Sequence, residues 1–300
     1  MAILLALLAA AANALATILQ RIGVEEASPA PGSTRSLMAS VLRRPIWFAG
    51  LGLTTASFFL QAIALSLGDL STVQPVMVTE IVFLVLVLGS WFRRTLGWRE
   101  LVGATGTAAG LGVFLALSAA RGGHGRPSHL DWALLLLACG GAVALAAGAA
   151  RRGPRWWRAA AYGVAAGICF ALTAAFVKSA ADQWQHGPLT LLVHFEAYGV
   201  AVSGLAGLVL SQHALEAGPV AASQSALLIV NPLSSIVIGV WLFGDHLHAF
   251  GARAGLEGAA LFVMFTALFV LSGSPLVATG AEERLTEQRP YERVVTSSPT

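Results

Sequence analysis

The sequence predicts an all-α polytopic membrane protein, with about nine transmembrane helices in two inverted-topology halves of four and five helices. Three observations lead to this prediction. Apolar residues make up 56% of the 300 residues and charged residues only 11%, whereas soluble proteins average about 25% charged residues. The apolar residues form nine long runs. Part of the first half is repeated in the second.

Each run is close to the length of about 20 residues that a helix needs to cross a bilayer. The runs are, in order, 1–20, 46–67, 71–92, 100–119, 130–150, 159–180, 188–210, 219–243 and 252–272. We expect residues 1–120 to form the first half, 130–272 the second half and 273–300 a disordered cytoplasmic tail. The stretch 28–44 is too short to cross the membrane, so we expect it to lie on the cytoplasmic surface.

The basic residues indicate the orientation. Arginine accounts for 17 of the 18 basic residues, and most arginines lie in short clusters between the runs, which is typical of membrane loops rather than of nucleic-acid binding. Fourteen arginines fall on one side of the nine-span arrangement and two or three on the other, so the first side is cytoplasmic. The N-terminus is then outside and the C-terminus inside. The preference for arginine over lysine favours a bacterial plasma membrane.

An internal repeat supports the division into halves. A shift of 150 residues aligns 56–91 with 206–241, with nine identities in 36 positions and no gap. Because the shift covers an odd number of crossings, the two copies point in opposite directions through the membrane. Inverted repeats are typical of secondary transporters, whose substrate site lies near the midplane between the copies. Shared low-complexity helix composition is the alternative explanation.

Two segments carry a resemblance to a known family. Residues 64–76 read ALSLGDLSTVQPV, and residues 98–111 read WRELVGATGTAAGL. Together they resemble the drug/metabolite transporter superfamily, of EamA-like type, and segments of the second half such as 239–245 resemble the same pattern. The resemblance implies a membrane transporter for a small metabolite, drug or cation, with no cofactor.

The helix count adds an alternative. Most members of the superfamily have ten helices, and a four-plus-five layout is similar to the nine-helix magnesium-transporter (NIPA-like) branch, as though one early helix had shrunk to 28–44. The resemblance to that branch implies a divalent-cation transporter. Glu80 departs from it, because a small polar residue stands there in the NIPA-like pattern.

Polar side chains inside the runs are the candidate substrate- or ion-binding residues, because a charge at the bilayer centre costs roughly 2.5–3.5 kcal/mol. Counting about 1.5 Å per helical residue places four of them near the midplane: Glu80, Glu196, Asn231 and Asn13. The further candidates are Gln74, Gln224, Lys178 and His194.

Glu80 is the leading candidate. Burial disfavours its charged form, which suits proton- or cation-coupled exchange; the alternative is a protonated carboxyl that hydrogen-bonds a neighbouring helix. Glu196 with His194 allows the same two interpretations. Lys178 is expected either to extend to the outer surface or to pair with a carboxylate such as Glu196 or Asp182. Gln74 and Gln224 align under the shift, and they are expected either to contact substrate or to join helices.

Other features are expected to be structural. Small residues at Gly103, Gly106 and Gly110 form a close-packing face, either for the bundle or for a homodimer. His246 and His248 are expected to be solvated rather than metal-bound. All eight tryptophans lie near predicted helix ends, as interfacial tryptophans do.

The rival from another class is an intramembrane enzyme or scaffold. The sequence has no H-E-x-x-H or G-x-S-x-G motif, and only a Glu80–Glu196 pair could imitate a catalytic dyad. We therefore expect a transporter and not an enzyme, with the lipid bilayer and a small substrate as its partners, and no nucleic acid or metal site.

Overall fold

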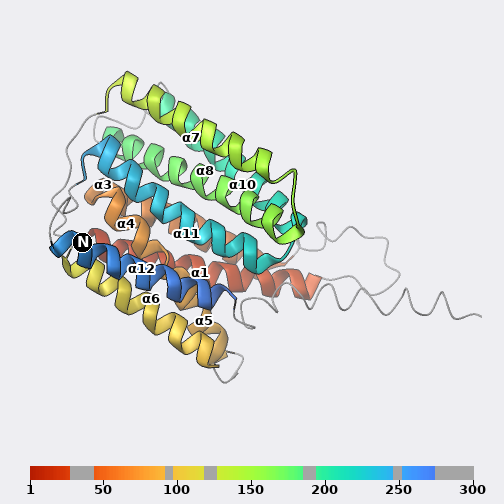
Figure 1. Ribbon diagram of the computed structural model, residues 1–300. Coiled ribbons are helices and arrows are strands. Elements are labelled where there is room, and N and C mark those ends of the chain that lie inside the picture. Colours follow the sequence, from red (N-terminus) through yellow and green to blue (C-terminus); the bar gives the residue numbers. More distant parts are fainter. Residues whose placement is uncertain (28–43, 92–96, 118–126, 185–193, 246–251, 274–300) are drawn as a thin grey trace, which may run out of the picture.

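The computed structural model describes residues 1–27, 44–91, 97–117, 127–184, 194–245 and 252–273. These residues form helices that lie side by side in one bundle (Figure 1). The helices are α1 (Ala2–Ala27), α3 (Pro45–Leu67), α4 (Leu70–Met77), α5 (Glu80–Trp91), α6 (Trp98–Leu117), α7 (His129–Ala149), α8 (Arg155–Trp184), α10 (Phe195–Ala217), α11 (Val220–Ile238), the π-helix η1 (Gly239–Phe243) and α12 (Ala252–Ser272).

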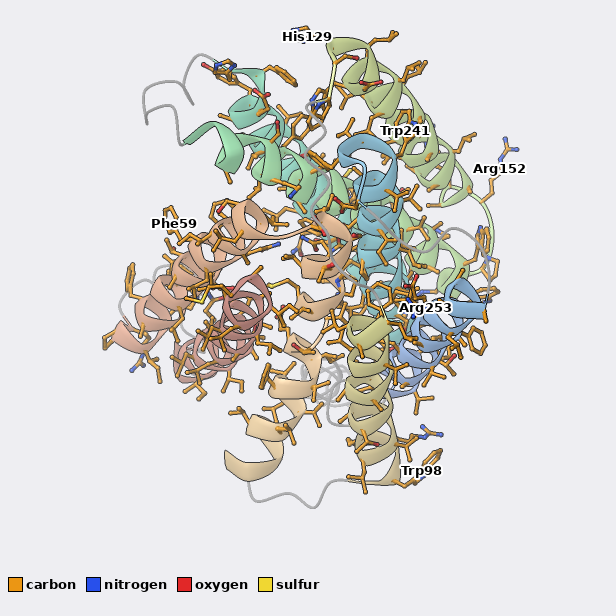
Figure 2. The ribbon with its side chains drawn as sticks, turned by 90° about the vertical axis from the view of Figure 1, so that its left-hand side faces the viewer. Phe59, Trp98, His129, Arg152, Trp241 and Arg253 are labelled. Atoms are coloured by element: carbon orange, nitrogen blue, oxygen red, sulfur yellow. The ribbon has the colours of Figure 1, made fainter. Side chains whose placement is uncertain are left out.

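In this described part, nine helices are long and apolar enough to cross a membrane, with α4 and α5 counted as one span and α11 and η1 as another. The predicted all-α class and helix number are therefore confirmed. Large apolar side chains such as Phe59 are exposed around the rim of the bundle (Figure 2), as they are in a protein that is surrounded by lipid. The predicted segments 28–44 and 273–300 lie almost wholly outside the described residues.

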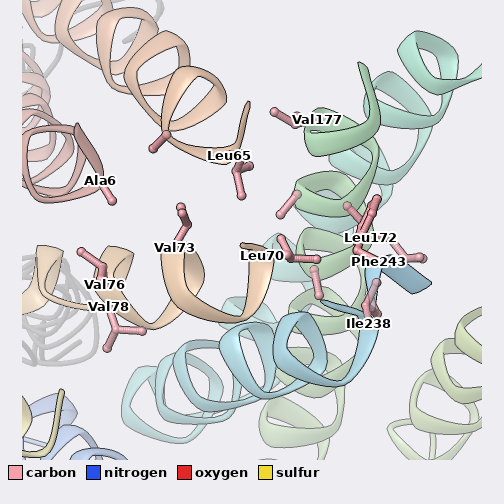
Figure 3. Packing of buried hydrophobic residues seen from close by; sticks show 14 of the residues in the cluster. Ala6, Leu65, Leu70, Val73, Val76, Val78, Leu172, Val177, Ile238 and Phe243 are labelled. Atoms are coloured by element: carbon pink, nitrogen blue, oxygen red, sulfur yellow. The ribbon is translucent and has the colours of Figure 1, made fainter. Parts of the chain in front are cut away.

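The helix α4 forms the centre of the bundle. Every residue from Leu70 to Val76 is buried, the polar Ser71, Thr72 and Gln74 included. Figure 3 shows Leu70 and Val73 of α4 among side chains of α3, α8 and α11, including Leu65, Leu172 and Ile238. The core thus joins elements of both halves of the chain.

The packing of the two halves follows one pattern. In the first half α1 packs along α3 and against α4 and α5, and in the second half α8 packs along α10 and against α11. The pairs α4–α11 and α6–α12 pack across the halves. The helix α7 packs against α8 and has no counterpart among the described helices of the first half. Among the described helices, the unmatched one is therefore α7.

Two turns repeat this correspondence in detail. The turn after α3 contains Gly68, where a Cβ atom would lie 2.7 Å from the Cβ of Ala2 at the start of α1. The turn after α10 contains Gly218, which packs closely on Arg155 at the start of α8. Only glycine allows backbones to approach so closely. Each turn therefore packs on the first residues of a helix of its own half, α1 or α8, which supports the equivalence of these two helices.

The predicted close-packing face on α6 lies inside the bundle. Cβ atoms at Gly103 and Gly106 would lie 2.7 Å from the side chains of Leu271 and Ala267 of α12. At Gly110, a Cβ atom would lie 2.7 Å from the backbone nitrogen of Met264. The bundle interpretation of these glycines is confirmed, because they bring α6 and α12 together.

One predicted interfacial tryptophan is in the core instead. Trp132 is 4% exposed, and its ring stacks on Phe176 with a centroid distance of 4.7 Å. Phe195 and Phe243 meet the Trp132 ring edge-on. Trp132 lies in the first turn of α7, so its position near a helix end was predicted correctly, but that helix end is covered by α8, α10 and η1.

Candidate functional site

The third span is broken in the middle of the membrane. Val78 and Thr79 separate α4 from α5, near the centre of the span Leu70–Leu88. In the break, the Val78 amide donates to the Pro75 carbonyl at 3.3 Å and the Thr79 amide to the Val76 carbonyl at 3.0 Å, a tighter i to i−3 pattern than that of an α-helix. Proline lacks an N–H and disrupts the regular ladder. Irregular backbone at membrane depth is tolerated where it is buried in protein or lines a cavity.

The break places Glu80 at the first position of α5. Its carboxyl is hydrogen-bonded by the side chain of Asn13, which comes from the middle of α1. Glu80 is partly exposed as a whole residue, although its carboxyl group is surrounded by protein. The two predicted site residues therefore meet at mid-membrane, and α1 and α5 are in contact there.

A second group of polar atoms belongs to α4 and α11, which pack against each other. Among the described residues, Nε2 of Gln74, Oδ1 of Asn231 and Oγ of Ser235 are buried without a hydrogen-bond partner. Gln74 is 2% exposed and Ser235 is fully buried. A buried polar group without a partner costs about 1–3 kcal/mol, so such groups are unusual in a protein interior and are candidates for contact with a solute.

One close contact relates the positions of these residues along the two helices. A Cβ atom at Gly239 would lie 3.0 Å from the backbone nitrogen of Ser71, so the end of α11 meets the start of α4. Ser235 and Asn231 lie one and two turns before Gly239, at the four-residue spacing that puts side chains on one helix face. On α4, Gln74 lies about one turn after Ser71, the residue that meets Gly239. Ser235 was not predicted, although its spacing from Asn231 is a signal that could have identified it.

Gln224 is not part of this group. It lies seven residues before Asn231, which corresponds to about 10 Å along the α11 axis, and it is partly exposed. The alignment of Gln74 with Gln224 therefore does not translate into a shared position in space.

Glu196 does not lie at mid-membrane, so this prediction is wrong. The helix α10 begins at Phe195, seven residues later than the predicted run, and Glu196 is in its first turn. There it accepts a hydrogen bond from the Ser179 hydroxyl at 3.4 Å, and Nδ1 of His194 is 4.0 Å from its Oε2 atom. The apolar residues between 188 and 193 extended the predicted run toward its N-terminal end. Glu196 and His194 therefore belong to one end of the bundle.

The Lys178 side chain contacts backbone carbonyls, and the predicted pairing with Asp182 lies outside the described side chains. Its Nζ atom is buried and donates to the backbone carbonyls of Leu65 at 3.2 Å and Gly68 at 2.7 Å. It also lies 5.5 Å from the ring centroid of Phe243. Within the described part, Lys178 neither extends to the surface nor forms an ion pair. The carbonyls at the end of α3 provide the negative partial charge instead.

The described residues contain no group of three or more metal-ligating side chains. The predicted loop histidines His246 and His248, like the side chain of Asp182, lie outside what the structure describes. Cys139 is partly buried and Cys169 is buried, and both are free thiols.

Comparison with known proteins finds a relative in Corynebacterium glutamicum. The chain is 28% identical over 294 residues to an uncharacterized protein of this bacterium, and the match covers 94% of this chain and 98% of the relative. No protein-family model and no solved structure matches the chain. With nine membrane-length helices among its described residues, the chain is an integral membrane protein, and its relative favours a bacterial membrane.

Proposed function

We propose that this chain is a secondary transporter of the drug/metabolite superfamily that moves a small polar solute or cation by alternating access. The observation that carries the proposal is the broken span. It puts the Glu80 carboxyl at mid-membrane, in a hydrogen bond with Asn13, beside a helix that shares an interface with the unpaired amide and hydroxyl groups of α11. Broken helices and polar groups at the midplane are typical of carriers.

The arrangement of the halves supports the same proposal. Glu80, Asn13 and Gln74 come from the first half, and Asn231 and Ser235 from the second. The halves share a packing pattern in which α1 corresponds to α8 and α3 to α10, and the odd number of crossings between them gives the two copies opposite directions. In such proteins, substrate binds where the copies meet and one copy rocks against the other.

The chemistry of the site favours a coupled carrier. A carboxyl group in low dielectric binds a proton or a cation readily, since the uncompensated anion is costly there. Glu80 can exchange a proton for substrate, while the Gln74 amide donates and the Asn231 carbonyl oxygen accepts hydrogen bonds. Such a site needs no covalent step, so we propose a carrier rather than an enzyme. A divalent-cation transporter is the alternative, because the same carboxyl and carbonyl oxygens are ligands of hard cations.

Transport in proteoliposomes tests the proposal. Purified protein is reconstituted, and a panel of radiolabelled metabolites and fluorescent drugs is tested for uptake driven by a proton gradient, with magnesium uptake driven by a magnesium gradient as the second arm. We expect Glu80→Gln to abolish the pH-gradient-driven component. Glu216→Gln is the matched control, because Glu216 is an exposed carboxylate near the end of α10.

The outcomes are distinct. Uptake that Glu80→Gln leaves unchanged in its pH dependence would remove Glu80 from the coupling. Uptake of magnesium alone would favour the divalent-cation alternative. Turnover of a peptide or lipid in detergent, without any gradient, would favour an intramembrane enzyme and contradict the proposal.

A further inference from the structure

Two side chains of opposite charge hold the turn between α3 and α4. Lys178 of α8 donates to the carbonyls of Leu65 and Gly68, at 3.2 and 2.7 Å. Asp245, which follows η1, accepts a hydrogen bond from the backbone amide of Ser71, at 2.9 Å between N and Oδ2. Both charges come from the second half of the chain, and both bind backbone of the first half.

Each charge lies at the helix end that attracts it. The last carbonyls of a helix and its first amides have no partners within the helix, and they carry partial negative and positive charge, respectively. Lys178 meets the carbonyl end of α3, and Asp245 meets the amide end of α4. Both side chains are buried, so salt screens these contacts far less than it screens surface ion pairs.

Aromatic rings fill the same end of the bundle. Phe243 lies beside the Lys178 ammonium and packs edge-on against Trp132, with centroids 6.4 Å apart. Trp132 in turn stacks on Phe176. These rings are almost completely buried, so they leave little room for water around the charged groups.

This arrangement lies directly beyond the candidate site. The Asp245 amide donates to the Gly239 carbonyl at 3.0 Å, and Gly239 is one helical turn from Ser235. A solute that leaves the α4–α11 interface in this direction therefore has to pass between the α3–α4 turn and the residues that hold it.

We propose that Lys178, Asp245 and the α3–α4 turn form a gate clasp, which closes this end of the transport pathway and must release for the pathway to open here. The inference rests on the proposed function, because it assigns a gate to that carrier. The arginine asymmetry makes this end the outer one.

Release of the clasp is coupled to the entry of water. Separation of α8 and Asp245 from the turn breaks both charge-assisted contacts, which are stronger than hydrogen bonds between neutral groups. The ammonium and the carboxylate then need hydration, because a buried charge without a partner is strongly unfavourable. In the closed state the charged groups contact backbone and exclude water, and in the open state they are hydrated. Removal of either charge shifts this equilibrium toward the open state.

Thiol accessibility at Ser235 tests the clasp. In a background with Cys139→Ala and Cys169→Ala, Ser235→Cys introduces a thiol of similar size at a buried position. The protein is reconstituted in vesicles, and a charged, membrane-impermeant methanethiosulfonate is applied from each side. We expect slow reaction from the clasp side, and an acceleration between about 5- and 150-fold in Lys178→Met or Asp245→Ala, the range typical of coupling between two states.

Matched variants separate gating from loosening of the fold. Arg158→Met is the control, because Arg158 donates to the Ala150 carbonyl at the end of α7, a similar contact within one half. We expect it to leave the reaction rate unchanged. Lys178→Arg keeps the charge, so it should react nearly as slowly as the parent. Asp245→Asn keeps an acceptor of similar size and should lie between the parent and Asp245→Ala.

The result that overturns the clasp is an unchanged rate from the clasp side in Lys178→Met and Asp245→Ala, or the same acceleration in Arg158→Met. If Lys178→Met or Asp245→Ala does not fold, the test uses Asp245→Asn instead. An unchanged rate of thiol modification in that variant also overturns the proposal. The assay needs no substrate. If the protein shows no uptake but the thiol becomes accessible when the clasp is removed, the proposed transport function is contradicted. The opening of this end of the bundle is then still supported.

Discussion

The close contact between α6 and α12 predicts a specific loss of stability in Gly110→Ala. A Cβ atom at position 110 would lie 2.7 Å from the backbone nitrogen of Met264 and 2.8 Å from the carbonyl oxygen of Ala260. Real Cβ atoms do not approach backbone so closely, and backbone cannot rotate away as a flexible side chain can. The two helices would have to separate along this part of their interface.

The matched control is on the same helix. A Cβ atom at Gly112 would meet nothing within 4 Å. Alanine is better than glycine in a helix by about 1 kcal/mol, and this gain applies to both variants. The difference between them therefore isolates the contact, and an added methyl group in a well-packed region costs about 1–3 kcal/mol. We expect Gly110→Ala to be less stable than Gly112→Ala by this amount.

Thermal unfolding in detergent, followed by the fluorescence of a thiol-reactive dye at Cys169, measures the difference. Gly112→Ala should unfold at or above the temperature of the parent, and Gly110→Ala several degrees below Gly112→Ala. Equal unfolding temperatures for the two variants would refute the packing of α6 on α12, because both positions would then have free space beside them.

Two further predictions concern the placement of the protein in the bilayer. In variants that keep a single tryptophan, brominated lipids should quench the fluorescence of Trp241, which is 51% exposed. The fluorescence of Trp132, which is 4% exposed, should remain nearly unquenched. Similar quenching of both would contradict the aromatic packing around Trp132. Arg152→Cys in the α7–α8 turn, in the background without native cysteines, should react with an impermeant thiol reagent only from the cytoplasmic side. Reaction from the outside would reverse the orientation that the arginine asymmetry predicts.

The spans could be predicted from the sequence because apolar length is a property of the local chain. The break at Val78–Thr79 is consistent with Pro75, which signals an interruption, and the midplane position of Glu80 followed from a run whose ends were nearly correct. The start of the seventh span was predicted wrongly because hydropathy alone does not fix the residue at which a helix begins, and α10 begins at Phe195. Residues 188–193 are apolar enough to extend the run, so Glu196 was placed about two turns too deep.

Partners were harder to predict than positions. The prediction for Lys178 considered other side chains and the surface, because opposite charges are visible in a sequence. Its partners in the structure are carbonyls at the end of α3, more than one hundred residues away, and which helix end meets which side chain depends on tertiary packing. The four-residue spacing of Ser235 from Asn231 was visible in the sequence, but the contact of their helix with α4 also depends on tertiary packing.

The connection between α3 and α4 has only two residues, Gly68 and Asp69. An extended residue spans at most about 3.6 Å, so this connection has almost no slack. If α4 tilts about the break before Glu80, it pulls the end of α3 with it, and α1 follows because α3 packs along its length. A small rotation of α4 at the midplane would therefore move α1, α3 and α4 together.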